Sequence, residues 1–86
     1  MKNKQELLLN YFSDLMVLIK DMAFESKREM TEKFNGNFDN PDYIFYRGKT
    51  NGYYEMISLM QQQAEAFGIP LKDLNLDDID ADKDLM

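Results

Sequence analysis

The chain has 86 residues and a formal net charge of −6 at pH 7, and it contains no histidine, no cysteine and no tryptophan. This length allows one domain at most, and the missing residue types exclude the commonest general base, thiol nucleophiles and thiolate metal sites. A chain this short buries only roughly 60–65% of its extended surface, so without disulfides we expect it to depend on long helix packing or on association.

The negative charge is concentrated near the C-terminal end. Residues 1–34 contain six basic and six acidic side chains, whereas residues 69–86 contain two basic and six acidic ones. An acidic surface opposes binding to nucleic acid or anionic lipid, so we expect no membrane partner, and nucleic acid is a disfavoured one. The longest apolar run, residues 15–19, is far too short for a membrane span, and no signal-like segment opens the chain. We therefore expect a cytoplasmic protein.

Residues 4–34 are predicted to form one long helix. Apolar residues recur at spacings of three and four, and neither proline nor glycine interrupts them. The stripe consists of Leu8, Phe12, Leu15, Ile19, Met22, Ser26, Met30 and Phe34. Asn35-Gly36 should end this helix, because glycine readily adopts the left-handed conformation that follows a helix.

Hydrophobic residues cover most of the circumference of the first half of this helix. A helix that packs against one partner needs an apolar arc only a little over 100° wide, and this arc is much wider. Either the C-terminal segment or a second copy of the chain should cover the remainder. The predicted self-association interface consists of Leu8, Leu9, Phe12, Leu15, Met16 and Ile19.

Residues 35–41 are predicted to form a turn. They are rich in turn-forming residues, and Asn40 before Pro41 is suited to cap a second helix that begins at Asp42. Because the connection is short, the two helices should run antiparallel.

Residues 42–67 are predicted to form the second helix. Its heptad spacing of alternate three and four residues is typical of a helix laid along another helix. The seam consists of Tyr43, Tyr46, Thr50, Tyr53, Ile57, Met60, Ala64 and Phe67, of which Thr50 is the only polar member.

Gly48 and the Asn51-Gly52 pair allow an alternative, in which residues 43–47 and 53–57 form a β-hairpin. The heptad favours the continuous helix because it keeps its phase through both glycines. Gly52, Met56, Leu59 and Ala66 form a neighbouring strip, where Gly52 would allow a partner helix to approach closely.

Phe67-Gly68-Ile69-Pro70 is predicted to stop the second helix with a Schellman motif. The four hydrophobic residues Leu71, Leu74, Leu76 and Ile79 indicate that residues 69–79 fold back over the hairpin. Residues 80–86 are predicted to be a frayed acidic tail.

No motif predicts catalysis, a cofactor or a metal. Asp78, Asp80, Asp82 and Asp84 alternate as in an EF-hand loop, but Lys83 stands where that loop needs glycine. Glu55 and Glu65 lie off the heptad seam and are expected to face solvent.

A cluster of tyrosines and cations, however, has the composition of a protein interface. The candidate partner-binding residues are Tyr46, Arg47, Lys49 and Tyr54.

The predicted fold is all-α: an antiparallel hairpin of two long helices with a short C-terminal segment, dimerising into a four-helix bundle. The expected core and interface residues are Leu7, Leu8, Leu9, Phe12, Leu15, Leu18, Ile19, Tyr53, Ile57, Met60 and Ala64. The predicted function is that of a non-enzymatic interaction or regulatory protein that binds itself and a further protein. Two alternatives remain: an inhibitor or immunity-type protein whose acidic C-terminus occupies a basic target, and a nucleotide or nucleic-acid binder acting through Arg47, Lys49 and nearby tyrosines.

Overall fold

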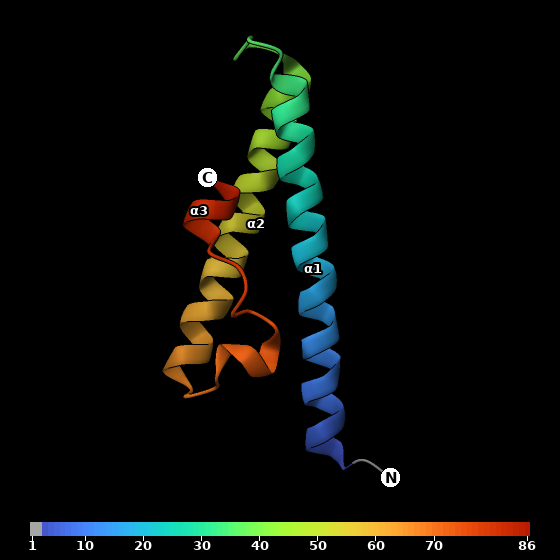
Figure 1. The fold of residues 1–86 in the computed structure, drawn as a ribbon, viewed down its shortest axis with the longest axis vertical. Helices are drawn as coiled ribbons and strands as arrows, with labels where there is room; N and C mark the ends of the chain where they lie inside the picture. Colours follow the sequence, from blue (N-terminus) through green and yellow to red (C-terminus); the bar gives the residue numbers. More distant parts are fainter. Residues whose placement is uncertain (1–2) are drawn as a thin grey trace.

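The computed structural model describes residues 3–86 and contains four helical elements. Helix α1 spans Lys4–Phe34, α2 spans Pro41–Ala66, the 3-10 helix η1 spans Leu71–Leu74, and α3 spans Ala81–Leu85. Within the described residues there is no strand, which confirms the predicted all-α class and the hairpin of two long helices. Figure 1 shows α1 and α2 joined at one end, with the C-terminal segment (residues 69–86) packed across them.

Helix α2 runs without interruption through Gly48 and Gly52, so the β-hairpin alternative is wrong. The residues that it buries are spaced seven apart: Thr50, Ile57 and Ala64. These are members of the predicted heptad seam, and their burial explains why the helix continues. Packing along one seam outweighs the cost of about 1 kcal/mol that each internal glycine adds.

Short polar caps and turns define where both long helices begin and end. The side chains of Asn3 and Asn40 accept hydrogen bonds from the backbone N–H groups of Glu6 and Asp42 at the starts of α1 and α2. At the end of α2, Gly68 has a φ of +72°, and the Ile69 N–H donates to the Ala64 carbonyl at 2.8 Å. This is the predicted Schellman stop.

A buried hydroxyl pair links the two long helices. The hydroxyls of Ser26 in α1 and Thr50 in α2 lie 2.7 Å apart, and both residues are fully buried. Each is the polar member of its predicted stripe, so the two polar interruptions meet and satisfy each other. Since an unpaired buried hydroxyl is costly, this pair also favours one register of the hairpin.

Between Met16 and Ala23 the buried face of α1 lies one residue beyond the predicted stripe, which it rejoins at Ser26. The structure buries Met16, Lys20 and Ala23, whereas Met22 is exposed. The displacement arises because α1 packs against α2 on one side and against the C-terminal segment on the next. The buried residues of α1 therefore lie between the side that faces α2 and the side that faces the C-terminal segment.

The core is centred on five buried residues from all three α-helices and the chain before α3. They are Ala23, Ile57, Ile79, Ala81 and Leu85. Of the expected core and interface residues, Ile57 and Ala64 are buried, and five others are exposed: Leu7, Leu8, Leu9, Phe12 and Leu18. None of these five belongs to the core of the single chain, and their part in an interface stays a prediction. Leu7, Leu8 and Leu9 lie in the first turns of α1, which extends beyond the end of α2 (Figure 1). Phe12 and Leu18 lie farther along α1, and Phe12 lines a hollow that it shares with α2.

The predicted frayed tail is also wrong, because residues 81–85 form α3 and Leu85 is only 2% exposed. A reciprocal cap starts this helix. The Asp80 carboxylate accepts from the Lys83 N–H, and the Asp80 N–H donates to the Asp84 carboxylate. Ala81 and Leu85, four residues apart, then face the same side and enter the core.

Side-chain hydrogen bonds attach residues 75–79, the chain before α3, to the hairpin. The Gln61 side-chain amide donates to the carbonyls of Leu76 and Ile79, at 3.0 and 2.9 Å. The Asn75 amide donates to the carbonyl and hydroxyl of Ser13. The Gln61 bonds satisfy backbone carbonyls in a stretch that has no secondary structure of its own, and the Asn75 bonds attach that stretch to α1.

Lys20 and Asp78 form an ion pair between α1 and the C-terminal segment. The Lys20 ammonium, which is almost fully buried, donates to Asp78 Oδ1 at 2.5 Å, while the Asp78 side chain stays mostly exposed. This hydrogen bond lowers the pKa of the Asp78 carboxyl below its ordinary value of 3.8. The ionised carboxylate therefore stabilises the folded state.

We expect Asp78→Asn to lower the free energy of unfolding by roughly 1–2 kcal/mol at neutral pH, because it leaves a buried ammonium without its counterion. Because the pKa of Asp78 is lower when folded, its contribution is complete above its ordinary pKa and is lost as the pH falls through the folded value. Urea unfolding of both proteins from pH 2 to 7 measures this. The difference between them should shrink below about pH 4, and a difference that grew in acid would contradict the assignment.

Candidate protein-binding surface

The C-terminal segment covers only one side of the hairpin. The hairpin side chains that form hydrogen bonds with it follow one line on each long helix, at intervals of seven residues. On α1 they are Ser13, Lys20 and Lys27, and on α2 they are Tyr54 and Gln61. Because residues seven apart lie nearly above one another on a helix, the segment follows a single side of the hairpin.

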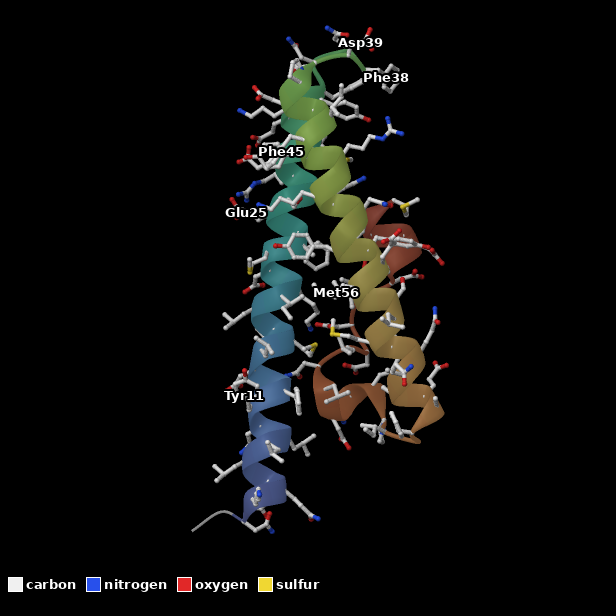
Figure 2. The ribbon with its side chains drawn as sticks, turned by 180° about the vertical axis from the view of Figure 1, so that it is seen from behind. Tyr11, Glu25, Phe38, Asp39, Phe45 and Met56 are labelled. Atoms are coloured by element: carbon white, nitrogen blue, oxygen red, sulfur yellow. The ribbon has the colours of Figure 1, made fainter. Side chains whose placement is uncertain are left out.

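The opposite side of the hairpin is exposed and apolar over the half that lies away from the helix connection. Figure 2 views this side and shows Tyr11 and Met56 on it. We call it the open face and assign to it the apolar residues that recur at helical spacings of three, four and seven around Tyr11 and Met56. They are Leu8, Tyr11, Leu15, Leu18, Met22, Met56, Leu59, Met60 and Phe67. Leu15 and Met60 are half-buried and the others are exposed, with Phe67 at 77% and Leu18 at 59%. Exposed hydrophobic residues that gather from two helices make this side a candidate binding surface.

An apolar hollow of about 440 Å³ lies in the open face, between the diverging ends of the helices. Phe12, Leu15 and Ile19 of α1 face Met60 and Phe67 of α2 across it, and the C-terminal segment closes it from behind with Leu74 and Leu76. Gln63 is the one lining side chain that is polar. The hollow therefore offers apolar contact and has almost no polar group to orient a reacting molecule.

The structure places the predicted self-association residues in two settings. Phe12, Leu15, Met16 and Ile19 come together along the hollow, although Met16 is buried and packs within the chain. Leu8 and Leu9 are exposed near the protruding start of α1. The predicted self-association set contained no residue of α2. The sequence did indicate one part of the α2 side, because Gly52, Met56 and Leu59 belong to the strip beside the heptad seam.

The structure does not bring the four candidate partner-binding residues together. Lys49 lies over the Tyr46 ring, with Nζ 5.7 Å from its centroid. Arg47 lies beside a different groove, between α1, α2 and the end of α3. The Tyr54 hydroxyl donates to Asp82 at 2.5 Å, which raises the pKa of Tyr54 above its ordinary value of 10.0.

Much of the acidic C-terminal charge has partners inside the chain. Asp78 pairs with Lys20, Asp82 accepts from Tyr54, and Asp80 and Asp84 cap α3. Within residues 3–86, no three or more acidic side chains gather to hold a metal ion. No helix in that range is long and apolar enough to cross a membrane.

Comparisons of the chain with protein-family models, with curated proteins and with solved structures found no match. The functional argument therefore depends on the residues and the geometry of the chain itself.

Proposed function

We propose that this chain is a non-enzymatic interaction protein that pairs with a second copy of itself through the open face. The observation that carries this proposal is the apolar surface to which both long helices contribute, on the side that the C-terminal segment leaves bare. Two such hairpins, packed face to face, would form a four-helix bundle, the arrangement in which amphipathic helix pairs bury their second apolar side. The outer sides of that bundle would remain free for a further protein.

The size of the exposed surface supports a second copy as the occupant. The chain exposes 6283 Å², whereas a compact monomer of 10.2 kDa should expose about 5300 Å². The excess of about 1000 Å² is close to the ~800 Å² that each partner buries in a stable interface. The radius of gyration, 15.3 Å, likewise exceeds the ~12 Å of a compact domain of this length.

Gly52 supports contact with another helix. It lies four residues before Met56 in α2, about one turn nearer the helix connection, and a Cβ added there would meet no atom within 4 Å. Packing inside the chain therefore does not require glycine at this position, although glycine weakens a helix. A partner helix that approaches closely would use the missing side chain, as small residues do where helices pack tightly.

Replacing Met22 with glutamate tests the pairing. Met22 is exposed on the open face, and Val17→Glu is the matched control because Val17 is exposed on another side of the same helix. In sedimentation equilibrium we expect the native chain to have a mass of about 20 kDa, twice the chain mass of 10.2 kDa. Met22→Glu should weaken association at least about tenfold, because it would bury charge at the interface, and Val17→Glu should not.

A native chain that stayed at 10.2 kDa up to high concentration would overturn the proposal. Equal loss of association in both variants would assign the effect to general destabilisation, so circular dichroism of each variant accompanies the measurement.

A further inference from the structure

A second groove lies on the side of the hairpin that the C-terminal segment covers, between the end of that segment and the helix connection. It has a volume of about 540 Å³, within the range of small-molecule sites. Its lining comes from α1, α2 and the end of the chain: Lys27, Met30, Tyr43, Ile44, Arg47, Gly48, Thr50, Asn51, Leu85 and Met86. This groove is separate from the open face.

The charge of the groove is opposite to that of the whole chain. Acidic residues outnumber basic ones by 16 to 10 overall, yet the groove is lined by two cations and by no acidic side chain. Arg47 has no carboxylate within salt-bridge distance in the described part of the chain. Lys27 donates only to the Met86 backbone oxygen, at a long 3.3 Å. Two cations are therefore available to an anion.

The remaining lining combines apolar contacts with neutral polar groups. Met30, Ile44 and Leu85 supply an apolar wall, while Tyr43 and Asn51 supply a hydroxyl and an amide. Gly48 contributes no side chain, and a Cβ there would meet no atom within 4 Å. The groove is thus open at Gly48, so a ligand can approach the α2 backbone there.

We propose that this groove binds a small molecule with an anionic head and an apolar body. Arg47 and Lys27 hold the head, which is a carboxylate or a phosphate, and charge-assisted hydrogen bonds from arginine suit both. The body lies along Met30, Ile44 and Leu85. This inference concerns a different surface from the pairing face and does not depend on it.

Titration of the ¹⁵N-labelled full chain with phenyl phosphate, phenylacetate and benzyl alcohol tests the proposal by NMR. Both anionic probes should give saturable shifts at the amides of Lys27, Gly48 and Asn51. The neutral alcohol should bind at least about tenfold more weakly, because it offers no charge to the two cations. Tighter binding of phenyl phosphate would support a phosphate head, and tighter binding of phenylacetate would support a carboxylate.

Arg47→Gln should weaken both anionic probes about tenfold, while Lys49→Gln should leave them unchanged. Lys49 is the matched control because it lies two residues away on α2, over the Tyr46 ring and outside the groove. The spectra themselves show whether each variant is folded. The proposal is overturned if no anionic probe saturates, if the alcohol binds equally well, or if the two variants behave alike.

Discussion

Replacing Ile57 with alanine is expected to lower the free energy of unfolding by about 3–4 kcal/mol. Ile57 is completely buried at the centre of the core, where α1, α2 and α3 meet. The loss combines the transfer of apolar atoms with the cavity that they leave, since neighbours from three elements cannot all close on it. For a domain of 86 residues the total stability is only roughly 4–13 kcal/mol, so the effect is large.

Guanidinium unfolding in the Met22→Glu background measures this effect without a contribution from association. Ile44→Ala is the matched control, because Ile44 is the same residue type on the same helix and is 52% exposed. It should change stability by no more than about 0.5 kcal/mol. If Ile57→Ala does not fold, Ile57→Val should still cost about 1 kcal/mol, and equal effects at positions 57 and 44 would contradict the described core.

Replacing Leu85 with alanine is expected to cost about 2–3 kcal/mol. Leu85 is 2% exposed and belongs to the core cluster, although five acidic residues lie within the ten positions before it. The expected loss lies toward the lower end of the range for buried leucine because α3 is short and near the surface. The same unfolding measurement applies.

Met86→Ala is the control for Leu85, because the adjacent side chain is 66% exposed. It should be nearly neutral. A harmless Leu85→Ala would mean that the end of the chain frays in solution, as the sequence alone suggested, and that α3 does not contribute to stability.

The buried face of α2 was predictable because this helix follows one seam along α1. Because α2 packs along one helix only, its buried residues recur with one heptad spacing, and Thr50 occupies a position of that heptad. The circumference of α1 is shared among α2, the C-terminal segment and the open face. Its hydrophobic residues are needed on all three, so their pattern does not show whether Met22 or Ala23 is buried.

Helix α3 was missed because five residues are too few to show a helical period. Its signals were local: Asp80 as a cap, and the spacing of four between Ala81 and Leu85. The groove beside Arg47 was missed for another reason. Lys27 and Arg47 are twenty residues apart, and only the register of the hairpin, in which Ser26 meets Thr50, places them on one groove.

The anchoring of the C-terminal segment has a consequence for the order of folding. The Ser26–Thr50 contact closes a loop of 24 residues, whereas the bonds from Lys20 to Asp78 and from Asn75 to Ser13 span 58 and 62. Contacts between residues that are distant in the sequence form more slowly than local ones. We therefore expect α1 and α2 to pack together before the C-terminal segment packs against them. The intermediate would be a bare hairpin with two uncovered apolar sides, and misassembly would start from that species.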